Sequence, residues 1–335
     1  MTVSPLGGVG MLRLIDMVRQ AGRRLVVPLA GYPGVQLTQS TMKQNEFNAE
    51  LQARSLYKLA ERTLPDMVFT MMDLSVEAGS LGLPVRFPLA ESATVEWHPV
   101  REIADIEQYK GIDPLYDGRV WVYLETVRLL KRKLDIPVGA YVIGPFTLAG
   151  LMMGANYIAL STIEHTELVR ATVNFCEHVV VRYARALQDA GADLLCILDP
   201  TAVILSPQAY VEFAGNSVEN VVRRLDTRVM LHVCGNCTHL LESMCRTGVQ
   251  GVSLGAMVDL SEASRRIPPE VVIFGNLDPV RTLLQGDRRK VRQEAESAIR
   301  RMDGQENFIL SSGCDLPAET PIENIVEMVR TAREL

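Results

Sequence analysis

The stretch DLLCILDPTAVILSPQAYVEFAGNSVENVVRRLDTRVMLHVC, residues 193–234, opens and closes on a short apolar run. The run DLLCILD has an uninterrupted apolar centre, and RVMLHVC is apolar apart from Arg228 and His232, which is typical of parallel strands that are buried on both faces. The longer segment between them has room for the helix that a parallel connection requires. This stretch therefore predicts one strand–helix–strand unit of an α/β fold.

Six further apolar runs extend this pattern along the chain: LVVPLAGY from Leu25, MVFTMM from Met67, PVGAYVI from Pro137, VQGVSL from Val249, VVIFGN from Val271 and NFILSSG from Asn307. Segments with helical periodicity separate the runs, for example 46–63, 167–190 and 288–302. Eight such units predict a single (β/α)₈ TIM barrel, with residues 1–335 forming one domain. An open doubly wound sheet is the alternative, but no GxGxxG motif follows any run.

The composition excludes several classes of protein. Lys and Arg number 34 against 40 Asp and Glu, so the net charge is −6 and lacks the basic surplus of a nucleic-acid-binding protein. No run of 18 or more uncharged apolar residues predicts a membrane-spanning helix. The start, MTVSPLGGVGMLRLIDMVRQAGRR, predicts an amphipathic helix rather than a signal peptide. We therefore expect a cytoplasmic protein that binds neither nucleic acid nor membrane.

Polar and metal-binding residue types gather where the strands are expected to end. In a (β/α)₈ barrel the active site lies at the C-terminal ends of the strands, on the loops that follow them. Those positions hold Tyr32, Asp73, Glu77, Asp199, His232, Cys234, Asn276, Asp278 and Cys314. This agreement between fold and residue chemistry indicates an enzyme. The irregular stretch 81–108 is interpreted as an excursion over the barrel mouth, either a lid or a passive loop.

A His-x-Cys pair and a late cysteine indicate a metal site. Side chains alternate along a strand, so His232 and Cys234 point to the same side. Cys314 follows the end of the eighth run and can reach the same space. One imidazole and two thiolates suit Zn²⁺, and three protein ligands leave a fourth tetrahedral position for water or substrate. The pattern thus predicts a catalytic zinc site.

Cys237 leaves alternatives open. It forms a Cys-x-x-Cys motif with Cys234, so it can be the fourth ligand of a closed structural site or half of a redox pair. A further interpretation makes His232 and both cysteines plain core residues. The cysteines in apolar or helical stretches are expected to be inert thiols, namely Cys176, Cys196 and Cys245.

Several segments, in their order along the chain, resemble the uroporphyrinogen decarboxylase superfamily, and within it the zinc-dependent, cobamide-linked methyltransferases. They are MDLSVEAGSLG from Met72, VIGPFTLAG from Val142, DPTAVILSP from Asp199, HVCGN from His232, GNLDP from Gly275 and SSGCDLPAETPIENI from Ser311. The methyltransferase branch binds zinc through a His-x-Cys pair and a late Cys, which match His232, Cys234 and Cys314. The resemblance implies methyl transfer from a methylcobamide, carried by a corrinoid protein, to coenzyme M or tetrahydrofolate.

The chain departs from its relatives at three positions. The decarboxylase carries a Tyr after its Pro-Trp-Thr-Leu segment and a Gly-His-Gly near its C-terminus, where this chain has Leu151 and Cys314. Asp73, by contrast, matches a family aspartate. Relatives that use coenzyme M can carry an acidic zinc ligand at the end of the sixth strand, where this chain has Gly255. The fourth ligand is then water or another group, for which the candidates are Glu77, Asp199 and Asp278.

The methyltransferase interpretation suggests roles for the remaining candidate residues. The candidate catalytic residues, which would bind a pterin or manage protons, are Asp73, Glu77 and Asp199. The candidate cofactor-binding residues are Tyr32, Asn276 and Asp278. A structural role is the alternative for each carboxylate, and Asn276 and Asp278 also suit a turn that caps backbone amides. The alternative functions are uroporphyrinogen decarboxylation and non-catalytic zinc binding.

Overall fold

The computed structural model describes residues 12–89 and 91–335. Residues 1–11 lie outside this description. They belong to the segment for which the sequence predicts a helix rather than a signal peptide, and to the expected single domain. Eight parallel strands form one sheet in the order β1-β10-β9-β8-β7-β6-β5-β2. Their bounds are β1 (Leu25–Val26), β2 (Val68–Phe69), β5 (Val138–Ile143), β6 (Leu194–Leu198), β7 (Arg228–Val233), β8 (Gly251–Leu254), β9 (Val272–Leu277) and β10 (Phe308–Ser312).

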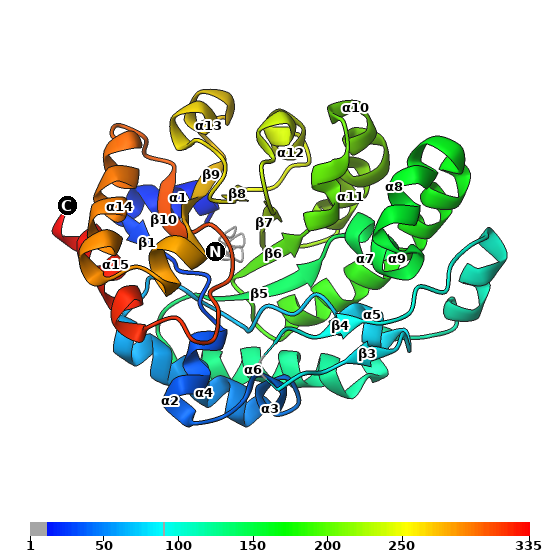
Figure 1. Cartoon of the computed structure of the whole chain (residues 1–335), viewed down its shortest axis with the longest axis horizontal. Coiled ribbons are helices and arrows are strands. Elements are labelled where there is room, and N and C mark those ends of the chain that lie inside the picture. The colour runs from blue at the N-terminus through cyan, green and yellow to red at the C-terminus, as the bar shows by residue number, and fades with distance from the viewer. Residues whose placement is uncertain (1–11, 90) are drawn as a thin grey trace, which may run out of the picture.

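The sheet curls into a barrel, so that the first strand lies beside the last (Figure 1). Its two outer strands, β1 and β2, are linked through Asp66, just before β2. The Asp66 amide donates to the Val26 carbonyl at 3.0 Å, and the Val26 amide donates to the Asp66 carboxylate at 2.7 Å. The predicted (β/α)₈ architecture is confirmed, and the open-sheet alternative is wrong because the curled sheet brings its two outer strands together.

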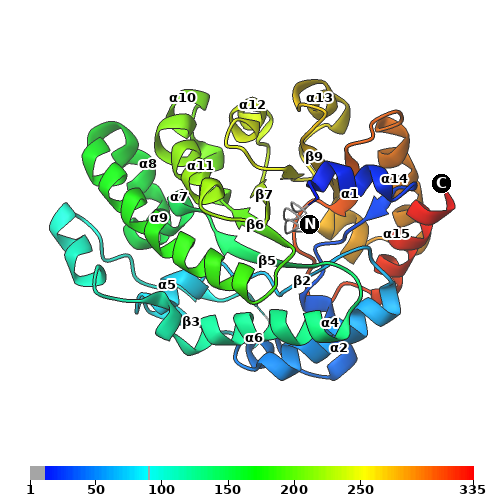
Figure 2. The same ribbon diagram turned by 180° about the vertical axis from the view of Figure 1, so that it is seen from behind.

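Helices surround the barrel on all sides, as both views show (Figures 1 and 2). The helices are α1 (Leu14–Gln20), α2 (Val35–Thr38), α3 (Met42–Glu46), α4 (Ala49–Thr63), α5 (Val76–Ser80), α6 (Gly118–Lys133), α7 (Pro145–Met153), α8 (Ala155–Glu164), α9 (Thr166–Asp189), α10 (Pro207–Tyr210), α11 (Asn216–Arg223), α12 (Leu241–Cys245), α13 (Leu260–Arg266), α14 (Arg288–Arg301) and α15 (Ile322–Glu334). The 3₁₀ helices are η1 (Tyr32–Gly34), η2 (Ile103–Tyr109), η3 (Pro114–Tyr116), η4 (Pro200–Ile204) and η6 (Thr238–Leu240), and the π-helices are η5 (Val211–Gly215) and η7 (Pro279–Leu284). The expected first helix is α1.

The barrel strands are buried on both faces, as their apolar runs predict, and only their first residues Leu25 and Arg228 are half-buried. In β6, Leu194, Cys196 and Leu198 belong to an inner apolar cluster, whereas Leu195 and Ile197 belong to the outer cluster under the helices. The inner cluster fills the barrel. Helix α1 contributes three apolar residues to it and closes the N-terminal end. The opposite, C-terminal end is the mouth, where the strand-end residues lie.

Two segments differ in detail from the sequence-based expectation. The helix expected over 46–63 is interrupted after Glu46, because Asn48 leaves the helical conformation and its side chain accepts a hydrogen bond from Leu51. The excursion 81–108 contains a short antiparallel hairpin of β3 (Val85–Arg86) and β4 (Thr94–Val95). Within residues 12–89 and 91–335 no single helix suffices to cross a membrane, and only the sharply bent pair of α7 and α8 has the required length and composition.

Candidate metal centre at the mouth of the barrel

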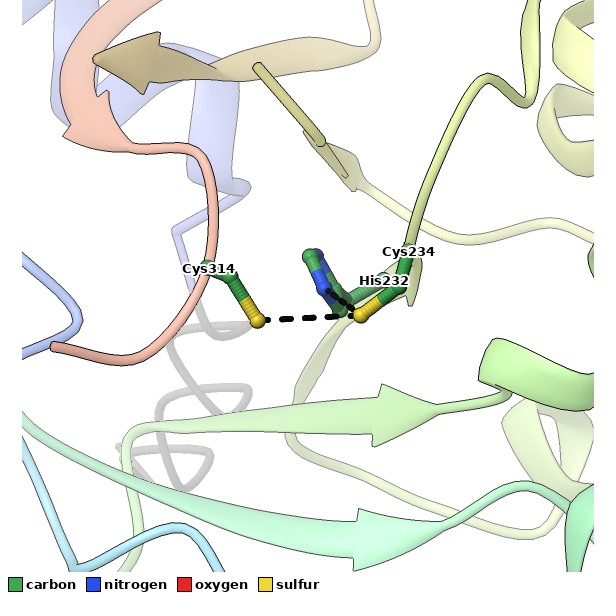
Figure 3. Close-up of side chains that lie close together, drawn as sticks. All are labelled: His232, Cys234 and Cys314. Carbon is green, nitrogen blue, oxygen red and sulfur yellow. Dashed lines mark hydrogen bonds between the residues drawn. The ribbon is translucent and has the colours of Figure 1, made fainter. Parts of the chain in front are cut away.

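Three ligand-type side chains meet at the mouth of the barrel (Figure 3). His232 lies near the end of β7, Cys234 follows that strand, and Cys314 approaches from the loop after β10. Parallel pairing brings these strand ends to the same edge of the sheet. One donor atom from each residue lies within 4.8 Å of the other two. Such a cluster of imidazole and thiol groups can hold a metal ion.

The imidazole of His232 is fixed from behind by the neighbouring strand. His232 is 1% exposed, and its Nδ1 lies 3.0 Å from the Ser253 hydroxyl and 3.2 Å from the Ser253 carbonyl oxygen. Because a carbonyl oxygen only accepts, Nδ1 carries the proton in this contact. The lone pair of Nε2 then faces Cys234, whose Sγ is 2.9 Å away. The ring therefore presents Nε2 as its ligand atom.

The two thiols of the cluster are joined by a hydrogen bond. Their sulfur atoms are 3.6 Å apart and both residues are half-buried. A hydrogen bond from Cys314 lowers the pKa of Cys234, while the same bond and burial raise the pKa of Cys314 to about 12. Cys237 lies outside the cluster among apolar side chains, and burial raises its pKa to about 11. Cys234 therefore loses its proton at a lower pH than Cys314 does.

Asp199, a candidate fourth ligand, instead binds the start of helix α7. Its Oδ1 accepts hydrogen bonds from the Thr147 amide at 2.8 Å and the Thr147 hydroxyl at 2.6 Å. Its own amide donates to the His232 carbonyl at 2.9 Å, which connects it to the ligand strand. Burial raises the pKa of Asp199 to about 6, and the bonds from Thr147 oppose that rise. The carboxylate therefore caps α7 beside β7.

The other two candidate catalytic carboxylates also contact the protein. Glu77 is buried and accepts a hydrogen bond from the Ile143 amide at 2.8 Å; burial raises its pKa to about 8. Asp73 forms a buried ion pair with Arg119, accepts from the amide and the hydroxyl of Ser75, both at 2.7 Å, and from Tyr123 at 3.3 Å. Neither carboxylate belongs to the metal-ligand cluster.

The candidate cofactor-binding residues bond to backbone or buried groups. The Tyr32 hydroxyl lies 2.9 Å from the Met72 carbonyl and 3.1 Å from Glu46. The Asn276 amide group donates to the carbonyls of Gly255 and Val258, at 3.0 and 2.7 Å. Asp278 caps η7 by accepting from the amides of Val280 and Arg281. Of the nine rim residues singled out by sequence, three therefore form the cluster and six bond elsewhere.

Sequence reasoning missed Ser253, Arg119 and Glu46. Ser253 pairs with His232 across neighbouring strands, and Arg119 reaches Asp73 from helix α6. Burial and the nearby Asp73 raise the pKa of Glu46 to about 7. Each acts through a partner far away in the chain, so no local motif marks it.

Comparison with known proteins places this geometry in a family. The model of the uroporphyrinogen decarboxylase (URO-D) family matches residues 14–335. A methylcobamide:CoM methyltransferase from Methanosarcina acetivorans is 31% identical over 91% of this chain and 94% of its own length. A uroporphyrinogen decarboxylase from Prochlorococcus marinus is 27% identical over 92% of this chain and 90% of its own length. The solved structure of a methyltransferase from Methanosarcina mazei superposes with a TM-score of 0.87 at 24% identity, covering 96% and 97% of the two chains.

Proposed function

The chain belongs to the uroporphyrinogen decarboxylase family, and we propose that it moves a methyl group from a methylated corrinoid to a thiol bound at a zinc site of His232, Cys234 and Cys314. Two Methanosarcina relatives, each aligned over 91% of the chain, are methylcobamide:CoM methyltransferases, and the chain is accordingly a corrinoid-dependent methyltransferase. The observation that carries the finer proposal is the convergence of one imidazole and two thiols at the barrel mouth.

The chemistry of the donor set fits zinc. Two thiolates at about 2.3 Å from a tetrahedral zinc ion lie about 3.8 Å apart, and the two sulfur atoms here are 3.6 Å apart. Nε2 of His232 faces the cluster, and the bond from Nδ1 to Ser253 is the kind of outer contact that zinc-binding histidines make. Glu77, Asp199 and Asp278 bond elsewhere, which supports an exogenous fourth ligand.

A zinc ion bound here would lower the pKa of an acceptor thiol enough to keep it as a thiolate at neutral pH. His232 keeps Nε2 toward the site because Ser253 holds Nδ1, and Cys234 and Cys314 keep their half-buried sulfur atoms on the mouth side. In the transfer, the acceptor sulfur forms a bond to the methyl carbon as the cobalt–carbon bond breaks. The cobalt keeps the electron pair and falls from Co(III) to Co(I), and the thiol proton goes to solvent.

The donor in this proposal is a methylcobamide carried by a corrinoid protein, and the acceptor is a thiol of the coenzyme M type. An open coordination position favours a thiol, because a thiol becomes a nucleophile only after it loses its proton. Tetrahydrofolate is the alternative acceptor, but its N5 is nucleophilic without such activation. The cysteine at position 314, where decarboxylases carry a histidine, favours methyl transfer over uroporphyrinogen decarboxylation. The burial of Cys237 outside the cluster disfavours a closed, non-catalytic site.

The proposal is tested by offering coenzyme M and tetrahydrofolate side by side with free methylcobalamin, and following demethylation by absorbance. Zinc is measured in the same samples by mass spectrometry. We expect about one zinc per chain and turnover with the thiol. Cys314→Ala should lose zinc and reduce turnover at least 100-fold, whereas the matched variant Cys237→Ala should keep both. Zinc-free wild-type protein with full activity would refute the mechanism, as would full activity of Cys314→Ala; transfer to tetrahydrofolate alone would refute the thiol acceptor.

A further inference from the structure

The end of strand β8 touches all three ligand segments without contributing a ligand. Ser253, on that strand, holds the His232 ring through its hydroxyl and its carbonyl oxygen. The next two contacts come from Gly255 and Ala256, which follow β8. We propose that residues 253–256 form a positioning segment, which sets the relative placement of His232, Cys234 and Cys314.

The contact to the Cys234 loop is a close approach of two backbones. A Cβ atom on Gly255 would lie 2.8 Å from the carbonyl oxygen and 3.2 Å from the amide nitrogen of Gly235. The 2.8 Å distance to a backbone oxygen is too short for a Cβ atom, so any other residue at position 255 would displace the backbone of Gly235. Gly235 directly follows Cys234, and it has a positive φ of 79°. The contact between Gly255 and this turn therefore fixes the position of the backbone next to Cys234, and with it the position of the Cys234 sulfur.

The contact to the Cys314 loop is also a close approach of two backbones. A Cβ atom on Gly313 would lie 2.6 Å from the amide nitrogen of Ala256. The Gly313 amide also donates to the Leu277 carbonyl at 2.7 Å, which ties the loop to β9. Cys314 is the next residue. The positioning segment is therefore wedged between the loops that carry the two thiols.

Asn276 anchors the positioning segment itself. Its side-chain amide donates to the carbonyls of Gly255 and Val258, on both sides of the turn that follows β8. The Val258 amide closes that turn by donating to the Gly255 carbonyl at 3.0 Å. The hydrogen bonds that hold the segment come from the protein alone, as a preorganised site requires. The same packing leaves no room at position 255 for an acidic ligand.

This inference rests on the proposed zinc site and is tested by metal affinity rather than by activity alone. Zinc binding to metal-free protein is measured by competition with a chromophoric chelator, and Co²⁺ substitution reports the sulfur-to-metal charge-transfer band. We expect Ser253→Ala to weaken zinc binding roughly 10-fold and Gly255→Ala roughly 10- to 100-fold, the range for changes beside metal ligands. The charge-transfer band should persist, because both cysteines remain.

Matched variants separate positioning from general damage. Ser217→Ala removes another buried hydroxyl, which bonds to the Ala214 carbonyl, and Gly111→Ala adds a methyl group where no atom lies within 4 Å. Both should bind zinc like the wild type, and Ser253→Thr should restore affinity by restoring the hydroxyl. Unchanged zinc affinity in both Ser253→Ala and Gly255→Ala would overturn the inference. So would a loss of zinc affinity that is fully explained by a lower melting temperature of the metal-free variant. Wild-type protein that binds no zinc would instead overturn the proposed function.

Discussion

Burial shifts the proton equilibria of three carboxyl groups near the mouth. It raises the pKa of Asp199 to about 6, of Glu46 to about 7 and of Glu77 to about 8. A carboxyl group with a raised pKa stays protonated in the folded chain at a pH where the unfolded chain has already lost the proton. Folding then takes up protons, and stability falls as the pH rises.

Glu77 should give the clearest example of this pH dependence. The contribution of Glu77 to the free energy of unfolding is fully present below about pH 4.5 and is lost as the pH rises through about 8. Between these values the free energy of unfolding falls by about 1.4 kcal/mol per pH unit. Glu77→Gln keeps an acceptor for the Ile143 amide and removes the titration. Urea unfolding between pH 5.5 and 8.5 should therefore show a flatter profile for this variant. The exposed control Glu164→Gln should follow the wild type, and parallel profiles for Glu77→Gln and wild type would contradict the assignment.

At the scale of elements, the eight barrel strands follow directly from eight apolar runs. This was possible because strands buried on both faces are mostly apolar, and their few polar residues lie near the strand ends. The interruption before α4 and the hairpin inside the excursion were not foreseen. The first depends on the single cap of Asn48, and the second is too short to create a pattern in hydrophobicity.

The residues of the candidate site also fall into two groups, those that the sequence predicts and those that it does not. His232 and Cys234 are two residues apart where β7 ends, so their common direction follows from the alternation of side chains along an extended chain. Ser253, Gly255 and Arg119 act across strands or helices, and their roles depend on register and packing that no local spacing encodes. For the same reason, the carboxylates expected at the rim are found in hydrogen bonds to neighbouring elements.

The cap of helix α7 provides a test at this scale. Asp199→Ala removes the acceptor for the Thr147 amide and hydroxyl, so we expect a loss of about 1–2 kcal/mol in the free energy of unfolding. Asp199→Asn keeps an oxygen acceptor and should lose less. Both variants should retain stoichiometric zinc and, where folded, turnover within a few-fold of wild type. A 100-fold loss of turnover in a stable, zinc-loaded Asp199→Asn protein would instead make Asp199 catalytic.

At the scale of the whole molecule, the exposed apolar side chains are unevenly distributed. Several large ones lie in the segments that lead from the mouth end of a barrel strand to the next long helix, namely Phe47, Leu89, Trp97, Ile204, Met257 and Val280. Within the part of the chain that is described, those toward the N-terminal end of the barrel are Leu12, Leu64 and Leu335. Exposed apolar side chains gathered on one face are typical of an interaction surface. In the proposed function, a protein that carries the methyl donor would dock on this face.

Charge substitutions on this face should therefore discriminate between two forms of the donor. Trp97 and Met257 are 63% and 71% exposed, so Trp97→Glu and Met257→Glu should leave the fold intact. Each should raise KM roughly 10-fold for a corrinoid protein loaded with methylcobalamin, since interface positions that matter contribute more than about 1 kcal/mol. Turnover of free methylcobalamin should not change, because that donor brings no protein surface to contact these residues. Leu64→Glu, at a residue 56% exposed on the opposite end, is the matched control, and an equal effect of all three variants on both donors would argue against docking at the mouth.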